Sequence, residues 1–144
     1  MFIGEHTHSI DNKKRLAIPS KFRKELGPKA VLTRGLDNCL FLYPLQEWQK
    51  FSEKLGQLSM GQAKTRSFAR LMLAGAVEVD FDNLGRILIP DYLKKYAELG
   101  KRIVVAGVLN RLEIWDKAIW EEYKKEIEKN TDAIAEKLGE LGLI

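Results

Sequence analysis

The pattern of hydrophobic and polar positions changes its period several times along this 144-residue chain, and each change indicates the boundary of an element. In residues 77–81 apolar and polar side chains alternate, which is the period of a half-buried β-strand. In residues 45–55, and again from about 116 to 127, apolar side chains recur every three or four positions, which predicts amphipathic helices. Shorter β-favouring runs occupy 30–33, 39–42, 103–106 and 112–115. The pattern therefore predicts an α+β fold that is mainly β.

One succession of elements occurs twice, which indicates an internal duplication. The first copy has strands at 5–10 and 16–18 and a helix at 21–26; the second has strands at 77–81 and 86–89 and a helix from 91 to about 99. In both copies an Asp-Asn pair begins the turn between the strands, because both side chains bond nearby backbone, and a proline ends the second strand. Each helix is expected to take its N-cap from the residue after that proline, Ser20 or Asp91.

The two copies are expected to form one interleaved fold. After each helix come two further strands, joined by turns predicted at 35–38 and 107–110. Four short strands bury too little surface to fold alone, so the copies should pack into one another. This predicts a first module with its following helix over 1–62, a linker helix over 63–76, and a second module with a C-terminal helix over 77–144.

The segment after about residue 130 is a further amphipathic stretch. Apolar stripes of this kind usually pack into the core, although an apolar tail also suits contacts between subunits. The pattern leaves both interpretations open for Ile134, Leu138, Leu141 and Ile144.

The net charge of +4 is distributed unevenly. Residues 1–44 carry eight Lys or Arg against four Asp or Glu, whereas residues 77–144 carry eleven against fourteen. A basic cluster on one module is expected of a nucleic-acid binder, although a solvated surface can be basic without any such role. The charge is densest just after the first turn, at Lys13, Lys14, Arg15, Lys21, Arg23 and Lys24.

Few residues could carry catalysis or hold a metal. Cys39 is the single cysteine, and His6 and His8 are the only histidines, so neither a disulfide nor a zinc cluster is expected. There is no glycine-rich phosphate loop and no nucleophile elbow. No run approaches the length of a membrane span, and the start is unlike a signal peptide. We therefore expect an intracellular protein that is not an enzyme and needs no cofactor, metal or small-molecule substrate.

The specific signal is the motif Asp-Asn-x-x-Arg, at 11–15 and again at 82–86. A structural interpretation is that the aspartate caps the turn and the arginine folds back onto it as a charge-assisted pair. A functional one is that Arg15 reaches guanine O6 and N7 while Lys13 and Lys14 meet phosphates, and the two interpretations are compatible. In the second copy Leu84 and Gly85 replace the lysines, so there the structural interpretation is stronger.

These residues resemble the MraZ family, which carries a duplicated Asp-x-x-x-Arg motif. The resemblance extends to the runs MFIGEH (1–6), KRLAIPSKFR (14–23) and LGRILIP (84–90), and it covers essentially the whole chain. It implies an AbrB/SpoVT-type fold, in which two swapped-hairpin halves in one chain form a double-split β-barrel flanked by helices. It also implies ring-shaped homo-oligomers.

The function implied by the resemblance is that of a bacterial transcriptional regulator in the cytoplasm and nucleoid. Such a protein binds short repeated boxes of double-stranded DNA upstream of the division and cell-wall gene cluster. Asp11 and Asp82 take the places that orient the motif arginines. With the basic neighbours inferred from charge, the expected DNA-binding residues are Asn12, Lys13, Lys14, Arg15, Lys21, Arg23, Lys24 and Arg86.

Two alternatives remain open from the sequence. The apolar tail and the acidic second half also suit an oligomeric scaffold that binds proteins without DNA specificity. An AbrB-type antitoxin is a third possibility, although such proteins usually carry one copy of the module.

The expected ring also predicts the spacing of the DNA boxes. A ring that presents several basic turns to one duplex favours direct repeats spaced by about one helical turn, ~10 bp.

Overall fold

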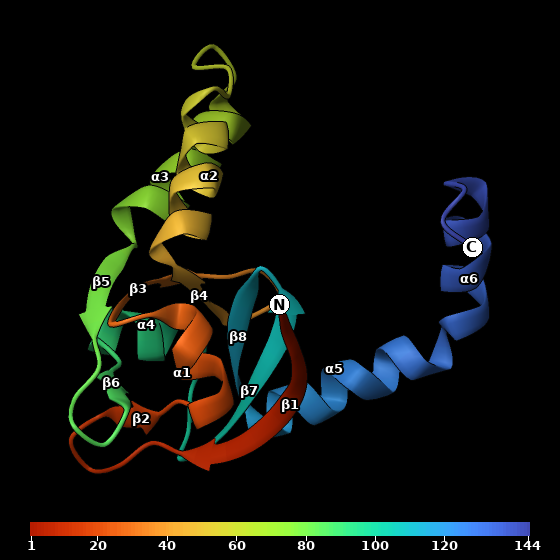
Figure 1. Ribbon diagram of the computed structural model, residues 1–144. Helices are drawn as coiled ribbons and strands as arrows, with labels where there is room; N and C mark the ends of the chain where they lie inside the picture. Colours follow the sequence, from red (N-terminus) through yellow and green to blue (C-terminus); the bar gives the residue numbers. More distant parts are fainter.

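The structure, a computed structural model, describes all 144 residues, and two antiparallel sheets form its centre (Figure 1). The larger sheet has six strands in the order β1-β7-β8-β4-β3-β5, and the smaller one pairs β2 with β6. The predicted α+β class is therefore confirmed. The strands are β1 (Phe2–Ser9), β2 (Arg15–Ala17), β3 (Lys29–Arg34), β4 (Leu40–Pro44), β5 (Val77–Asp80), β6 (Arg86–Leu88), β7 (Arg102–Leu109) and β8 (Arg111–Asp116).

The two copies of the repeat exchange strands with one another. β1 pairs with β7 of the second copy, and β5 in turn pairs with β3 of the first. The equivalent strands β4 and β8 meet at the centre of the six-stranded sheet. Each copy thus supplies an edge strand to the other, as expected for units too small to close a core alone.

The two-stranded sheet, which we call the β2–β6 ribbon, lies between the two copies of the motif. Its register pairs Arg15 with Leu88, Leu16 with Ile87 and Ala17 with Arg86, which is symmetric about the central pair. The pairing continues on both sides, since Ile89 N–H donates to the carbonyl of Lys14 and Ile18 N–H donates to that of Gly85. The central Leu16 and Ile87 are fully buried and anchor the ribbon to the core.

The strand pairing shown by the structure does not close a barrel. A single bridge, between Ile10 just after β1 and Leu16 of β2, is the only ladder contact that joins the two sheets. This pairing therefore does not show the double-split β-barrel that the resemblance implies.

One apolar core joins the two copies. It combines residues of the ribbon, of the inner face of the large sheet and of the two short helices that follow the prolines, including Phe22 and Leu93. A second cluster on the other face of the sheet is rich in aromatic rings, with Tyr43 and Trp115 at its centre. The helices are α1 (Ser20–Leu26), α2 (Leu45–Gly56), α3 (Ala63–Ala74), α4 (Asp91–Tyr96), α5 (Lys117–Lys129) and α6 (Thr131–Glu140).

The two apolar stripes of the C-terminal segment have different surroundings. In α5, Ile119, Trp120 and Tyr123 pack against the aromatic cluster. Figure 1 shows α6 extending away from the sheets, and its residues are exposed apart from the half-buried Leu138. The tail therefore does not contribute to the core of this chain. No helix combines the length and apolarity needed to cross a membrane.

The predicted N-caps of α1 and α4 are wrong. Pro19 and Pro90 occupy the cap positions with extended backbone angles, and neither helix has a side-chain cap hydrogen bond. Ser20 and Asp91 are instead the first helical residues. Proline has no side-chain acceptor, so no side chain bonds the first N–H groups of either helix, and the ring only fixes φ at the cap, at −50° for Pro19 and −60° for Pro90.

Some predicted boundaries also shift. β1 begins at Phe2 instead of residue 5, α4 ends at Tyr96 instead of near 99, and β7 continues to Leu109 through most of the turn predicted at 107–110. Gly107 lies in that strand and pairs with Gly4 of β1, and the position needs glycine because an added Cβ would lie only 2.6 Å from the carbonyl carbon of Phe2. The glycine thus marks a close approach of two strands and not a turn.

Candidate nucleic-acid interface

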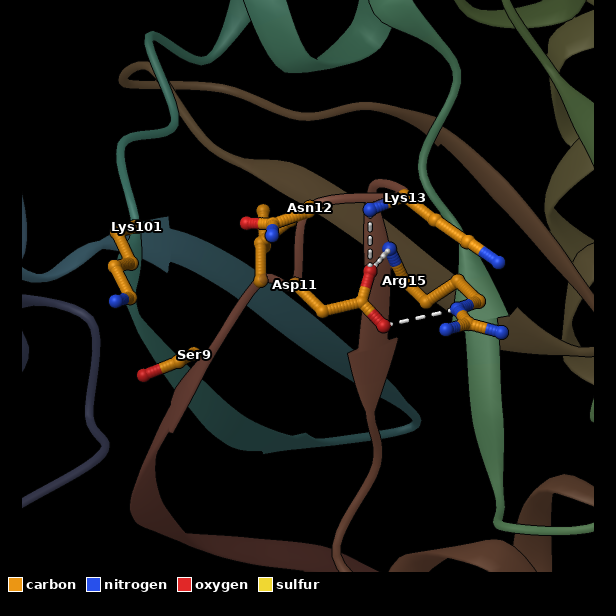
Figure 2. A pocket seen from close by; sticks show the side chains of 7 residues that line it. Ser9, Asp11, Asn12, Lys13, Arg15 and Lys101 are labelled. Carbon is orange, nitrogen blue, oxygen red and sulfur yellow. Dashed lines mark hydrogen bonds and ion pairs between the residues drawn. The ribbon is translucent and has the colours of Figure 1, made fainter.

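The first copy of the motif forms a compact turn around the Asp11 carboxylate (Figure 2). Asp11 Oδ1 accepts hydrogen bonds from the backbone N–H groups of Lys13 (2.8 Å) and Arg15 (3.0 Å), and Oδ2 accepts one from Arg15 Nε at 2.9 Å. These donors favour the charged form and lower the pKa of Asp11, the backbone N–H of Arg15 most of all. The carboxylate therefore holds both the turn and the arginine side chain.

The second copy repeats this geometry. Asp82 Oδ1 accepts from the backbone N–H groups of Leu84 and Arg86, both at 2.9 Å, and Oδ2 accepts from Arg86 Nε at 2.8 Å. The pKa of Asp82 is lowered, chiefly by the backbone N–H of Arg86. The fourth motif residue has a left-handed backbone in both turns, with φ of 61° at Lys14 and 74° at Gly85. The structural interpretation thus applies equally to both copies.

The fold brings the two motifs into contact with each other. Arg86 Nη1 lies 3.6 Å from Asp11 Oδ2, so the arginine of the second copy faces the carboxylates of both. Arg15 bonds Asp11 through Nε alone, which leaves both of its terminal nitrogens without a protein partner. The two arginines therefore differ in how many guanidinium donors remain free to bind a ligand.

The other residues of the first turn also differ from one another. Asn12 and Lys13 are exposed, and the Lys13 ammonium has no ion-pair partner. Lys14, in contrast, places its Nζ 2.5 Å from Asp91 Oδ1, and this contact lowers the pKa of Asp91. Part of the positive charge counted at this turn is thus already paired within the chain.

The basic side chains of α1 separate into two places. The Arg23 guanidinium lies over the second turn, where a Cβ on Gly85 would come within 1.9 Å of Arg23 Nη1. Lys21 lies towards β1, with its Nζ 4.9 Å from the centre of the Phe22 ring and close to Gly4. Lys24 is exposed. The structure therefore brings Arg23 to the motifs and leaves Lys21 beside β1.

Comparison with known proteins places the whole chain in one group. The family model described as "MraZ protein, putative antitoxin-like" matches twice, over residues 1–71 and 72–140. The chain belongs to the MraZ family. It is 55% identical over 143 residues to the transcriptional regulator MraZ of Pediococcus pentosaceus, covering 99% of this chain and 100% of that protein. The MraZ regulators of Moorella thermoacetica (50% identity, 96% of each chain) and Clostridium tetani (49% identity, 99% of this chain and 100% of that protein) are also similar.

Sequence reasoning missed several residues beside the MraZ motifs. Ser9 and Lys101 line an open hollow together with Asp11, and in Figure 2 Lys101 and Lys13 lie on opposite sides of that aspartate. No local signal places Lys101 here, because it arrives through the strand exchange. Leu88 lies on the outer face of the ribbon, which the alternation of residues 86–89 could have shown.

The residues considered for other chemistry are placed as ordinary structural side chains. The His6 ring packs edge-on against Phe22 at 5.4 Å, and burial lowers the pKa of His8. Cys39 is fully buried, and burial raises the pKa of its thiol. No group of three or more His, Cys, Asp or Glu side chains comes together in a way that could hold a metal ion. The arrangement at the ribbon is instead one of cationic donors on an open surface, which suits contact with an extended anion.

Proposed function

We propose that this MraZ-family chain is a sequence-specific DNA-binding transcriptional regulator. The observation that carries the proposal is Arg15: its Nε is fixed by Asp11 while its two terminal nitrogens are free. A guanidinium oriented in this way is prepared to donate two parallel hydrogen bonds to one acceptor pair. The names of the relatives, which are transcriptional regulators, support the same function.

The β2–β6 ribbon is the element that meets the bases. The major groove of B-DNA admits a two-stranded β-ribbon, and the commonest specific contact there is arginine to guanine O6 and N7. Arg15 makes this contact in our proposal, and Asp11 orients it. Arg86 contributes less, since its guanidinium is shared between Asp82 and Asp11.

The surrounding basic residues supply contacts to phosphates, which add affinity without sequence preference. Lys13 and Asn12 are exposed at the first turn, and Arg23 lies over the second. Lys14 is available when its pair with Asp91 opens, because both side chains remain solvent-accessible. Lys21 and Lys24 of α1 extend the basic surface.

Several copies of the chain act together in this proposal. One ribbon neutralises few phosphates, whereas a ring of identical copies multiplies the contacts through effective concentration. We propose a homo-oligomeric ring that binds short direct repeats spaced by ~10 bp upstream of the division and cell-wall gene cluster, in the cytoplasm and nucleoid. The double-split barrel and the division into modules at 1–62 and 77–144 belong to the same proposal.

Fluorescence anisotropy tests the role of Arg15. The DNA should carry repeats selected by the protein itself from a randomised pool. Arg15→Ala should weaken binding by about 1–3 kcal/mol and flatten the discrimination between bases at one position. Arg70→Ala, which removes an exposed arginine of α3, is the matched control and should leave both unchanged. Wild-type affinity in Arg15→Ala would contradict the base contact.

The exposed apolar side chains of the tail favour the alternative of a protein-binding scaffold. Ile127, Ile134, Leu141, Leu143 and Ile144 are each exposed by 38% or more and cover no part of this chain's core. If the wild-type chain selects no sequence from the randomised pool and binds all duplexes equally weakly, the scaffold becomes the better account.

A further inference from the structure

The outer face of the β2–β6 ribbon carries four side chains, and one of them is conspicuously apolar. Successive strand residues point to opposite faces, so Leu16 and Ile87 face the core while Arg15, Ala17, Arg86 and Leu88 face outward. Leu88 is 56% exposed, and on this face it lies opposite Arg15 and two residues along the strand from Arg86. Its isobutyl group is therefore part of the surface that we propose enters the DNA groove.

The register places Leu88 directly opposite Arg15. Directly opposed side chains on one face of an antiparallel pair have Cβ atoms about 5 Å apart, and neighbouring base pairs are stacked about 3.4 Å apart. A leucine beside an arginine that contacts guanine thus meets the same or the next base pair. The one apolar group on the floor of the major groove is the 5-methyl group of thymine.

We propose that Leu88 is a specificity-determining residue that contacts the 5-methyl group of a thymine next to the guanine bound by Arg15. The proposal rests on the DNA-binding function proposed above and adds a second base to it. It assigns a role to a side chain outside the Asp-x-x-x-Arg motif, in the copy whose turn has lost its lysines.

The same contact gives the ribbon a direction. The position equivalent to Leu88 in the first copy is Ala17, which lies opposite Arg86. The side chain of alanine is too short to contact a base that leucine can contact. The two ends of the nearly symmetric ribbon therefore differ in their apolar contact with DNA. A ribbon of this kind distinguishes the two orientations of a box, which is what binding to direct repeats, as opposed to palindromes, requires.

Deletion of single methyl groups from the DNA tests this contact. Each thymine of the selected box is replaced in turn by deoxyuracil, which removes the 5-methyl group and keeps the base pair. Wild-type protein should lose about three- to fivefold in affinity at one thymine, the factor for one buried methyl group, and little at the others. Leu88→Ala should bind the thymine and uracil duplexes equally.

Leu84→Ala is the matched control, because Leu84 is an equally apolar and even more exposed residue of the same copy, at the tip of its turn. It should keep the wild-type sensitivity to uracil. Thermal unfolding should show that both variants remain folded, since neither leucine belongs to the core. A Leu88→Ala protein that retains the full loss at the same thymine would overturn the proposal.

Exchanging the two equivalent residues provides a second test. The double variant Ala17→Leu with Leu88→Ala should move the uracil-sensitive thymine to the other half of the box, and an unmoved position would contradict the proposed direction. If wild-type protein selects a box and depends on Arg15 but is insensitive to uracil everywhere, Leu88 has no such role while the DNA-binding function stands. If it selects no box, both proposals fail.

Discussion

The two Asp-x-x-x-Arg turns have the same backbone and different chemistry at their tips. In each, one carboxylate accepts two backbone N–H groups and the arginine Nε, with distances that agree within 0.1 Å. The tip residues are Lys13 and Lys14 in the first and Leu84 and Gly85 in the second. The aspartate therefore specifies the turn, and the tip residues are free to differ in charge.

The neighbours of the turns explain part of this difference. Gly85 has no side chain because Arg23 occupies the space that a Cβ would need. At the equivalent place in the first copy, Lys14 accepts a left-handed backbone and extends its side chain to Asp91. A duplicated turn has thus diverged according to what packs over it.

The largest expected effect is on stability, when Gly85 of the second turn is replaced by lysine, the residue at the equivalent position 14 of the first turn. Gly85→Lys should lower the free energy of unfolding by about 1–3 kcal/mol, because φ is 74° there and Arg23 must move. The reciprocal Lys14→Gly should change it by less than about 0.5 kcal/mol, since relief of the backbone offsets the greater flexibility of the unfolded chain. Urea unfolding measures both.

Removing Arg23 separates the two causes. Adding Arg23→Ala to Gly85→Lys should restore the part of the loss that comes from crowding and leave the part due to the backbone. If Gly85→Lys is as stable as wild type, the two turns are interchangeable and the comparison fails.

A smaller effect is expected on the salt dependence of DNA binding. Lys13→Ala should reduce the slope of log K against log salt by about 0.9, the value for one lost phosphate contact, without changing base preference. Leu84→Lys, which places the missing charge on the second turn, should steepen the slope by a similar amount if that turn also approaches DNA. Titrations at several salt concentrations measure the slopes, and an unchanged slope in Leu84→Lys would place the second tip away from the duplex.

The smallest effect concerns acid stability, where the two turns should behave alike. The pKa values of Asp11 and Asp82 are lowered in the folded state, so their contribution is complete above the unfolded value near 4 and is lost as pH falls through the folded value. Asp11→Asn and Asp82→Asn should each flatten the acid decline in the urea midpoint by the same small amount. A clear inequality between them would show that the cross-contact from Arg86 to Asp11 matters at this level.

Sequence reasoning succeeded where the interactions are local. The turns, the pairing of Arg15 with Asp11 and the four strands of each copy all follow from residues a few positions apart. The contacts of Arg86 with Asp11, Arg23 with Gly85 and Lys14 with Asp91 join the two copies, and they depend on the register of the strand exchange. No pattern within one copy contains that register.

The errors at Gly107 and at the two helix caps have different origins. The preference of glycine for turns predicts a turn at Gly107, whereas β1 of the other copy pairs so closely beside it that the strand needs glycine there. Ser20 and Asp91 are residue types that favour the N-cap position, but the proline before each of them occupies that position instead. The neighbour that overrides the local preference is distant in the sequence for Gly107, whereas for Ser20 and Asp91 it is the adjacent proline.

The pairing of β1 with β7 has a consequence for how the chain is made. Phe2 pairs with Leu109, so β1 leaves the ribosome before its partner strand, which is synthesised about a hundred residues later. At about 5–20 residues per second, that interval lasts roughly 5–20 s. During it the nascent chain carries an unpaired strand, which is a template for wrong pairing with other chains. Translation speed, and any chaperone that shields β1, should therefore affect the yield of correctly folded protein.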